Sequence, residues 1–320
     1  MNNISSKCPI CDGALVRLYD LAGFECVRCV SCSTESLAKL PTVDELIAFY
    51  SGRSGRKTKR WEQRMALVDR AFSDYLRDYR EASGREKPGT FLDAGGGVGY
   101  YAKAAQNHGI SATLLDYDEL ALAFARETLG LNDSVQGDVA ECLKAKGEAS
   151  FDYILARHVI EHVLSPQQFL RDITKLLRPG GHLMVETPNS LTKEQWAHPR
   201  QIHLHYQMIR RGNPSMGAGE AIRLACAKSM SGVNPPKHLW GFSPQGLRTL
   251  LEKSGFTVKK TYCAICGHST FDPLFYEEQR LGARRGLGIP YYFFERIISP
   301  LFSGRGMNLV MLAEFTGKKS

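Results

Sequence analysis

The chain has 320 residues, 43% of them hydrophobic and 23% charged, which is typical of a globular protein and excludes a disordered or fibrous one. No apolar run approaches the roughly 20 residues needed to cross a bilayer, and the first residues lack the apolar core of a secretory signal, so we expect a cytoplasmic protein. The net charge of +8 favours anionic partners, but the basic residues form no dedicated tail.

Residues 1–40 are rich in cysteine. Cys8 and Cys11 form one C-x2-C pair, and Cys29 and Cys32 form a second pair after 17 intervening residues. This spacing predicts a four-cysteine zinc site, because each pair can turn two thiolates toward one tetrahedral ion. Cys26 offers an alternative second pair with Cys29, but it falls inside a predicted strand. With no open position for a substrate, the zinc would be structural and would contribute folding energy; free cysteines without metal are the alternative.

Residues 41–88 are expected to form a mostly helical linker. Within it, residues 51–60 are basic and punctuated by glycine and serine, which we interpret as a solvated connection because no aromatic residues are interleaved for base stacking. An RNA- or anion-binding patch is the alternative. Apolar residues at steps of three and four then predict an amphipathic helix. They are Trp61, Met65, Val68, Phe72, Leu76 and Tyr79.

From residue 89 to residue 320, short β-type runs alternate with helical stretches, as in βαβ units that build a parallel sheet. Residues 189–237 form an insert after the fifth strand. Inserts at this point cover the carboxyl edge of an open α/β sheet, where ligands bind, so we expect a substrate lid. The predicted strands are Thr90–Ala94, Ser111–Leu115, Ser134–Gln136, Phe151–Ala156, His182–Thr187, Thr257–Tyr262 and Leu309–Phe315.

A glycine-rich turn follows the first of these strands. Gly95, Gly97 and Gly99 are spaced G-x-G-x-G, whereas a dinucleotide fingerprint would place its third glycine one residue later. Glycine lets a ligand approach the backbone, and the following helix offers unpaired N–H groups to an anion. Asp116 closes the second strand, where a carboxylate can accept hydrogen bonds from both hydroxyls of a ribose. Asp138 follows the third strand and is placed to accept from an adenine amino group.

These motifs resemble, in order, those of the class I S-adenosylmethionine-dependent methyltransferases. The cofactor-binding segment of that family is similar to FLDAGGGVGYYAKAAQNHGISATLLDYD. Later blocks are similar to QGDV, FDYILARHVIEHV, LLRPGGHLMVETPN and HLWGFSPQGLRTLLEKSGF. The resemblance is strongest to the ubiquinone-biosynthesis O-methyltransferases and related small-molecule enzymes. It implies a doubly wound, Rossmann-like α/β fold with a seven-stranded, mostly parallel sheet whose last strand is antiparallel. A structural domain with an incidental glycine turn is the alternative, which five ordered blocks argue against.

The resemblance also implies which residues bind S-adenosylmethionine. Asp93 and the glycines would line its methionine end, Asp116 would hold the ribose and Asp138 would meet the adenine. The expected cofactor-binding residues are Asp93, Gly95, Gly97, Gly99, Asp116, Tyr117, Asp138, Val139 and Arg157. The first 40 residues likewise resemble the zinc ribbons that precede methyltransferase domains in sugar, lipid and natural-product pathways, although Ser33 stands where those ribbons usually have glycine.

The block after the fourth strand contains H-x-x-E-H, which elsewhere marks a zinc protease. We reject that interpretation, because no third ligand is placed and the glycine turn would be unexplained. Ubiquinone-type relatives have acidic residues and a histidine here that can hold a divalent cation; Glu161 and His162 match them, but His158 stands where they have glutamate. We expect His238 or His158 to act as a general base, although His238 could instead pack at a helix entry. The expected substrate-pocket residues are Glu161, His162, His203 and His205.

Two further segments remain. Cys263 and Cys266, near His268, form a lone pair that we interpret as thiols without a metal. Residues 289–302 are strongly apolar and aromatic, so we expect a core segment or a homodimer face, with a membrane-contacting patch as the alternative.

Together these features predict methyl transfer from S-adenosylmethionine to a small molecule. The acceptor would be a sugar, a lipid-linked or nucleotide-linked compound, or a natural-product intermediate. One alternative is an RNA methyltransferase, which the zinc module, the basic linker and a pI near 9.0 would suit. Another is a cofactor-binding regulator without turnover, which the near-complete cofactor motif argues against.

Overall fold

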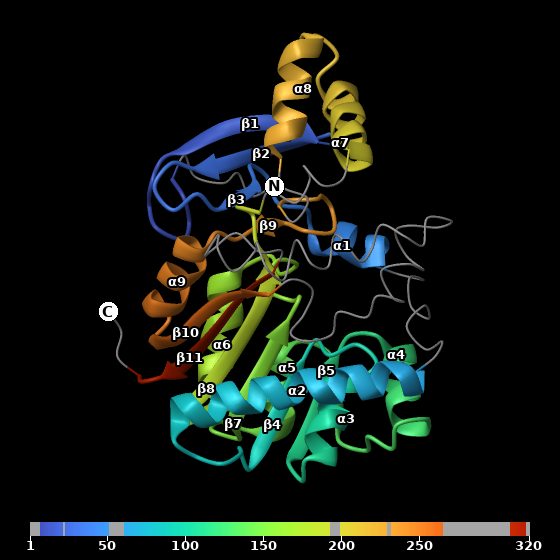
Figure 1. Cartoon of the computed structure of the whole chain (residues 1–320), viewed down its shortest axis with the longest axis vertical. Helices are drawn as coiled ribbons and strands as arrows, with labels where there is room; N and C mark the ends of the chain where they lie inside the picture. The colour runs from blue at the N-terminus through green and yellow to red at the C-terminus, as the bar shows by residue number, and fades with distance from the viewer. Residues whose placement is uncertain are drawn as a thin grey trace.

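The computed structural model describes residues 7–21, 23–50, 61–192, 199–228, 232–264 and 308–317. These residues form two sheets, one of seven strands and one of four (Figure 1). The larger sheet has the strand order β10-β11-β8-β7-β4-β5-β6. Its strands are β4 (Thr90–Ala94), β5 (Ser111–Asp116), β6 (Ser134–Gln136), β7 (Phe151–Arg157), β8 (Leu177–Pro188), β10 (Phe256–Ala264) and β11 (Asn308–Phe315).

The seven predicted strands are all present in the larger sheet. β4, β5, β6, β7 and β8 pair in parallel, and β11 runs antiparallel to both of its neighbours, β8 and β10. The seven-stranded, mostly parallel sheet with an antiparallel last strand is therefore confirmed. The largest boundary difference is in β8, which begins at Leu177 rather than at His182, whereas the other strand ends differ from the prediction by at most two residues. Pairing of Leu177 with Phe151 on β7 extends the strand backward.

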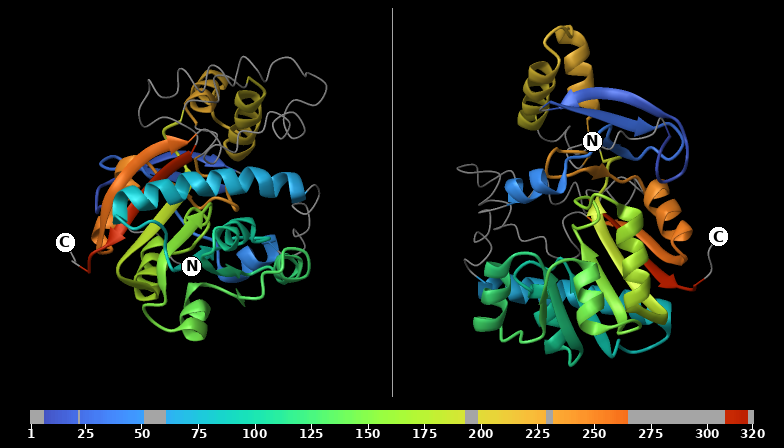
Figure 2. Two further views of the ribbon diagram at one scale, coloured as in Figure 1. Left: turned by 60° about the horizontal axis from the view of Figure 1, so that its bottom comes forward. Right: turned by 180° about the vertical axis from the view of Figure 1, so that it is seen from behind.

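Helices cover both faces of this sheet, as the doubly wound fold requires (Figure 1 and Figure 2). Successive strand residues point to opposite faces, so Phe91 packs in one core cluster and Leu92 in the other. The first face is covered by α2 (Trp61–Ser83), α3 (Tyr100–Asn107) and α4 (Glu119–Glu127). The second face is covered by α5 (Val139–Lys146), α6 (Pro166–Leu176) and α9 (Pro244–Lys253).

Helix α2 lies across the sheet and contributes to its core. Of its predicted apolar face, Phe72, Leu76 and Tyr79 are at most 7% exposed, whereas the first three residues are partly buried. Tyr75, which was not predicted, is also fully buried. Phe72 meets Phe91 of β4 edge to face, with ring centroids 5.2 Å apart. The second half of the 41–88 segment therefore packs against the main sheet, while α1 (Val43–Tyr50) lies in its first half.

The small sheet lies above the carboxyl ends of the parallel strands (Figure 1). It is antiparallel and contains β1 (Leu15–Leu21), β2 (Phe24–Cys29), β3 (Glu35–Leu37) and β9 (Trp240–Gly241). Its last strand, β9, belongs to the main domain. The small sheet therefore contains strands from both parts of the chain. Each C-x2-C pair lies in a tight turn; we call Cys8–Cys11 the first knuckle and Cys29–Cys32 the second knuckle. Their cysteines belong to one continuous hydrophobic cluster with residues of β4, β7, α6 and α9.

The insert at residues 189–237 contains two helices, α7 (Pro199–Gly212) and α8 (Ala218–Ala227), which lie beside the small sheet (Figure 1). Asn213, just after α7, donates from Nδ2 to the Asp20 carbonyl over 3.0 Å. The insert is therefore attached to β1.

No helix in the described part of the chain is long and apolar enough to cross a membrane. Several sequence predictions concern residues outside that part. They are the basic stretch 51–60, the apolar stretch 289–302, Cys266 and His268.

Truncating the α2 core contact should destabilise the fold. We expect Phe72→Ala to lower the free energy of unfolding by about 3–5 kcal/mol, because it leaves a cavity against β4. Arg77→Ala, on the same helix with a side chain 56% exposed, should change it by less than about 1 kcal/mol. Urea denaturation followed by circular dichroism measures both, and equal midpoints would contradict the packing of α2.

Candidate functional site

The turn between β4 and α3 depends on glycine at two positions. Gly95 has φ 70° and Gly99 has φ 82°, in the left-handed region that side chains rarely adopt. There is also no room, since a Cβ on Gly95 would lie 2.5 Å from Val159 Cγ2 and one on Gly99 would lie 2.6 Å from Leu131 Cδ1. The sequence therefore folds here into a tight turn that presents backbone instead of side chains.

Asp116, at the end of β5, holds this turn. Its Oδ2 accepts from the Gly97 amide over 2.7 Å, and its Oδ1 accepts from the Asp118 amide over 2.9 Å. The parallel pairing of Ala94 with Leu115 brings the two strand ends together. Each carboxylate oxygen can accept more than one hydrogen bond, so Asp116 retains acceptor capacity for a ligand.

Asp93 lies beneath the turn and is only 1% exposed. Its Oδ2 accepts from the Ala102 amide over 3.2 Å, which ties the end of β4 to α3. A Cβ on Gly96 would lie 2.3 Å from the Asp93 carboxyl carbon, so the carboxylate and the turn are in direct contact. The structure thus places Asp93 as a support of the turn.

The predicted adenine side of the site is also assembled. Tyr117, directly after β5, is 70% exposed, and its hydroxyl faces the Asp138 carboxylate. Asp138 caps α5, since its Oδ1 accepts from the Glu141 amide over 2.9 Å, and Val139 is the buried first residue of that helix. Asp116, Tyr117 and Asp138 together offer carboxylates and an aromatic ring, groups that suit a nucleoside.

A buried carboxylate that the sequence analysis missed, Glu186 on β8, lies at the same edge of the sheet. Tyr75 of α2 donates its hydroxyl to Oε2, and Asn308 of β11 donates to Oε1 over 2.8 Å. Arg157, at the end of β7, has its Nε 3.3 Å from Glu186 Oε2. Its guanidinium carbon lies over the Tyr101 ring, 5.4 Å from the ring centroid. Burial opposes ionisation of Glu186, but the positive charges of Arg157 and His158 and the hydrogen bond from Tyr75 outweigh it and lower its pKa. A lone acid in the apolar run HLMVETP is the signal that could have identified it.

His158 is held between two carboxylates. Its Nδ1 lies 3.3 Å from Glu161 Oε1, and its Nε2 lies 3.5 Å from Glu186 Oε1. Its backbone has φ 55° and donates to the Glu186 carbonyl over 2.7 Å. Burial and Arg157 lower the pKa of His158, yet the two carboxylates outweigh them and raise it above its usual value. The two carboxylates therefore favour the protonated imidazolium, and the ring can accept a proton only after it has lost the one that they stabilise.

Glu161, His162 and His238 form a second cluster, and their ligand atoms all lie within 4.8 Å of one another. Glu161 is 1% exposed, and its Oε2 accepts from the Thr187 hydroxyl over 3.0 Å. The rings of His162 and His238 meet edge to face at 4.9 Å. One carboxylate and two imidazoles could hold a divalent cation or a polar substrate group.

The electrostatics of this cluster favour an ionised acid beside neutral histidines. Burial opposes ionisation of Glu161, but His158, His162 and His238 outweigh it and lower its pKa to about 2. Burial lowers the pKa of His238 to about 3 despite the nearby Glu161. The buried Nδ1 of His238 has no hydrogen-bond partner among the described residues, so it is available to a ligand.

The other two predicted pocket histidines belong to α7. His203 is exposed, and its Nε2 lies 2.8 Å from Gln207 Nε2 on the same helix. His205 is buried against α8, where burial lowers its pKa to about 4. The structure therefore places these two residues on the helical insert and does not group them with Glu161.

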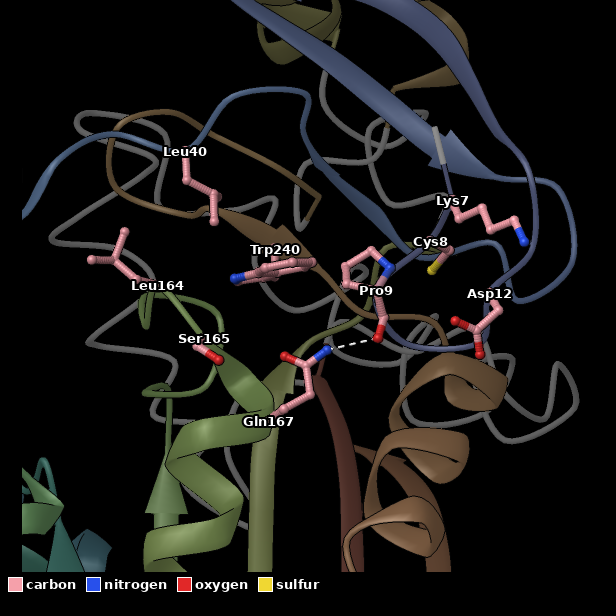
Figure 3. A pocket seen from close by; sticks show the side chains of 9 residues that line it. All are labelled: Lys7, Cys8, Pro9, Asp12, Leu40, Leu164, Ser165, Gln167 and Trp240. Carbon is pink, nitrogen blue, oxygen red and sulfur yellow. Dashed lines mark hydrogen bonds between the residues drawn. The ribbon is translucent and has the colours of Figure 1, made fainter. Parts of the chain in front are cut away.

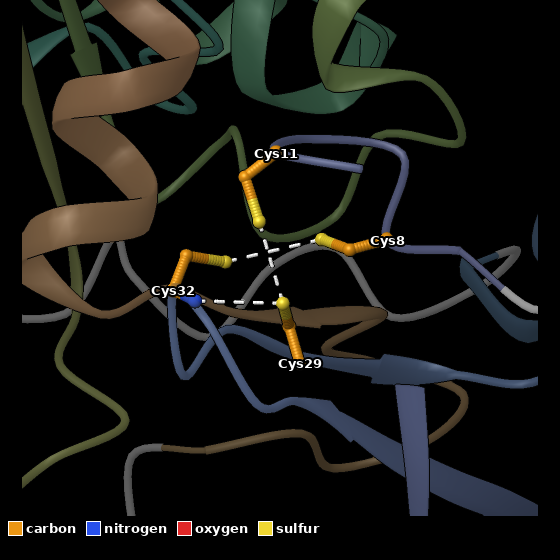
Figure 4. Close-up of side chains that lie close together, drawn as sticks. All are labelled: Cys8, Cys11, Cys29 and Cys32. Atoms are coloured by element: carbon orange, nitrogen blue, oxygen red, sulfur yellow. Dashed lines mark hydrogen bonds between the residues drawn. The ribbon is translucent and has the colours of Figure 1, made fainter. Parts of the chain in front are cut away.

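The four cysteines of the two predicted pairs converge (Figure 4). Cys8 and Cys32 have sulfurs 3.8 Å apart, those of Cys11 and Cys29 are 3.3 Å apart, and all four lie within 4.8 Å of one another. Sulfurs around a tetrahedral zinc ion with bonds of about 2.3 Å are separated by about 3.8 Å, so the cluster has the size of a zinc site.

The local backbone explains why the knuckles form. Asp12 and Ser33, each one residue after a C-x2-C pair, have φ near 60° (63° and 60°), so Ser33 adopts the left-handed turn although it is not glycine. The Cys32 amide donates to the Cys29 sulfur over 3.4 Å. The hydrogen bond between Cys8 and Cys32 lowers the pKa of Cys32 and raises that of Cys8, so one member of the pair is favoured as a thiolate, the form that metals bind. Cys26 lies outside the cluster, buried in β2.

Comparisons with known proteins identify relatives of this chain. A family model described as "Methyltransferase domain" matches residues 66–261. A ubiquinone biosynthesis O-methyltransferase of Caulobacter vibrioides is 39% identical over 108 residues, which cover 32% of this chain and 42% of that protein. Another, of Parvibaculum lavamentivorans, is 33% identical over 172 residues, covering 48% and 66%. The chain therefore matches less than two thirds of the length of these relatives.

A solved structure is also similar in outline. It is the 1,6-didemethyltoxoflavin-N1-methyltransferase of Burkholderia thailandensis, with a TM-score of 0.49 and 17% sequence identity. The alignment covers 90% of this chain and 97% of that one.

The buried Glu161 should make folding stability depend on pH. Its pKa is about 2 in the folded protein against 4.5 ordinarily, so its stabilising contribution is complete above pH 4.5 and is lost as the pH falls toward 2. We expect Glu161→Gln to flatten the fall in unfolding free energy over this range, measured by urea denaturation at each pH. Glu62→Gln, exposed on α2, should leave the curve unchanged. Parallel curves for wild type and Glu161→Gln would contradict the assignment.

Proposed function

The chain belongs to the methyltransferase-domain family, and we propose that it transfers a methyl group from S-adenosylmethionine to an oxygen atom of a small molecule. The observation that carries this proposal is the glycine turn at the end of β4, hydrogen-bonded to the Asp116 carboxylate at the end of β5. A turn that exposes its backbone beside a carboxylate able to accept hydrogen bonds fits the amino-acid and ribose parts of that cofactor.

The described residues around the turn fit the cofactor. Asp116 would accept from the ribose hydroxyls, Asp138 from the adenine amino group, and Tyr117 would cover the base. Asp93 would support the turn at the methionine end. S-adenosylmethionine supplies a methyl group already activated on a sulfonium, so the contribution of the protein is to align the acceptor and exclude water.

We propose His158 as the general base. A base works best when its pKa lies near the operating pH. The carboxylates of Glu161 and Glu186 raise the pKa of His158, whereas burial lowers that of His238 to about 3, which makes His238 a weak proton acceptor. His162 and His238, beside Glu161, would then bind the acceptor.

A small-molecule acceptor is supported by the relatives, which are named for the biosynthesis of ubiquinone. The proposal is tested by incubating the protein with methyl-labelled S-adenosylmethionine and fractionated cell extract. Label should appear in the small-molecule or lipid fraction. Label confined to RNA would show that the acceptor class is wrong.

We also propose that the four-cysteine cluster binds one structural zinc ion. The sulfur separations and the convergence of all four thiol groups support this assignment. Zinc would cross-link two knuckles that are joined only through short strands, and in this way would contribute folding energy.

Removing the Asp116 carboxylate should weaken cofactor binding. We expect Asp116→Ala to raise the dissociation constant for S-adenosylhomocysteine by about 100-fold, because two hydrogen bonds to a charged group are lost. Isothermal titration calorimetry measures the constant, and circular dichroism checks the fold. Asp44→Ala, exposed on α1, is the control. An unchanged constant for Asp116→Ala would refute the ribose assignment.

Replacing the proposed base should lower turnover without changing cofactor affinity. Once the acceptor is identified, we expect His158→Gln to lower kcat by about 10²–10⁴-fold. In the wild type, kcat/KM should rise with pH through a midpoint above 6.5, since the base must be deprotonated and its pKa is raised. His203→Gln, on the exposed face of α7, is the control. Full turnover by His158→Gln would assign the base elsewhere.

The zinc assignment predicts a stoichiometry. Purified wild-type protein should contain one equivalent of zinc by elemental analysis, and Cys29→Ser should contain much less. Cys26→Ala, which removes a buried cysteine outside the cluster, should keep the full equivalent. Equal zinc loss in both variants would mean that the cluster is not the binding site.

A further inference from the structure

The cysteine cluster and the histidine cluster are connected by a short path of hydrogen bonds. β3 follows the second knuckle and pairs with β9, with Glu35 opposite Gly241 and Ser36 opposite Trp240. His238 lies two residues before Trp240. One strand pair therefore separates the sulfur cluster from the candidate substrate site.

The second knuckle is also in contact with the start of α9. Ser243, the cap of α9, donates its hydroxyl to the Cys32 carbonyl and is 1% exposed. A Cβ on Gly246, in the first turn of α9, would lie 1.9 Å from the Thr34 hydroxyl, so the helix and the knuckle touch without space between them. Both contacts lie shortly after β9 in sequence, because α9 begins three residues after Gly241.

At its other side, β9 is bonded to the histidine cluster. The amides of Leu239 and Trp240 both donate to the Glu161 carbonyl, over 2.8 and 3.2 Å. The Trp240 indole donates to the Val163 carbonyl over 2.8 Å. The backbone of β9 thus fixes both Glu161 and His238, the residue that precedes Leu239.

Trp240 lies where the first knuckle meets the main domain (Figure 3). Its side chain is 3% exposed and forms one wall of a pocket of ≈ 340 Å³ that reaches Cys8 and Pro9 of the first knuckle. Gln167 of α6 donates a hydrogen bond from Nε2 to the Pro9 carbonyl over 2.8 Å. The first knuckle therefore also meets the main domain beside Trp240.

We infer that the four-cysteine cluster is a positioning element of the active site. Through β3 and β9, it fixes the position of His238 relative to Glu161 and His162. Without the metal, the second knuckle loses the geometry that aligns β3, and β9 loses its pairing partner. Two residues are too short to persist as a strand alone. The glycine turn and Asp116 lie on β4 and β5 and have no part in this path, so cofactor binding is independent of it. This inference rests on the proposed function for the role of the histidine cluster.

Hydrogen exchange on the full chain, with and without zinc, tests the inference. Chelation should speed exchange of the Leu239 and Trp240 amides at least about tenfold, because their bonds to Glu161 open. The amides of β4 and β5 should change less than about twofold. In a Trp61→Phe, Trp196→Phe background, Trp240 is the only tryptophan, and its emission should shift to the red on chelation.

Two outcomes would overturn the inference. One is unchanged exchange at β9 after elemental analysis shows that zinc has left. The other is a uniform rise in exchange across the large sheet, which would make zinc a global folding element. Neither readout requires methyl transfer. If S-adenosylhomocysteine fails to bind the zinc-loaded protein, the proposed function fails, while the exchange data still decide the role of the knuckle.

A variant that keeps all four cysteines separates positioning from metal binding. Ser243→Ala removes the bond to the Cys32 carbonyl, so exchange at Leu239 and Trp240 should rise with zinc retained. Ser243→Thr, which can donate and cap, should restore slow exchange. Ser254→Ala removes a hydroxyl at the other end of α9, which donates to the Leu250 carbonyl. This change should have no effect on β9. Equal effects of Ser243→Ala and Ser254→Ala would refute the path through Cys32.

Discussion

The carboxyl edge of the large sheet is organised around one buried charge, the Glu186 carboxylate. Its side chain is fully buried, accepts hydrogen bonds from Tyr75 of α2 and Asn308 of β11, and forms an ion pair with Arg157 of β7. A buried carboxylate is tolerated only with such partners, because removing it from water costs several kcal/mol. Its partners are thereby fixed in place, and so is His158, which lies between Glu186 and Glu161.

The rest of the candidate site follows from strand direction. Five neighbouring parallel strands end at the same edge, so groups far apart in sequence meet there. Asp116 on β5 serves the proposed cofactor half, and His158 after β7 serves the proposed acceptor half. The two halves lie on different strand pairs of one rigid sheet, which can hold the reacting groups at a constant separation.

Local patterns in the sequence were sufficient to locate the strands and part of the site, and the family resemblance supplied the direction of the last strand. Short β-type runs located all seven strands. The C-x2-C spacing, together with the predicted strand that contains Cys26, selected the four cysteines that converge. Glu186 was missed because its role depends on Tyr75 and Asn308, which are more than a hundred residues away in both directions. The packing of His205 against α8 was not predicted either, because it too depends on which element covers that part of α7. Periodicity specifies which face of an element is apolar but not which distant element covers it.

The same limit applies to β9, a strand of two residues that no pattern could have indicated. It exists because partners on both sides satisfy its backbone: β3 on one and the Glu161 carbonyl on the other. A strand that belongs to both modules leaves no hinge between them in the described part of the chain. The small sheet and the main domain are then coupled through the backbone of β9, so a displacement of one must alter the hydrogen bonds that β9 makes with the other.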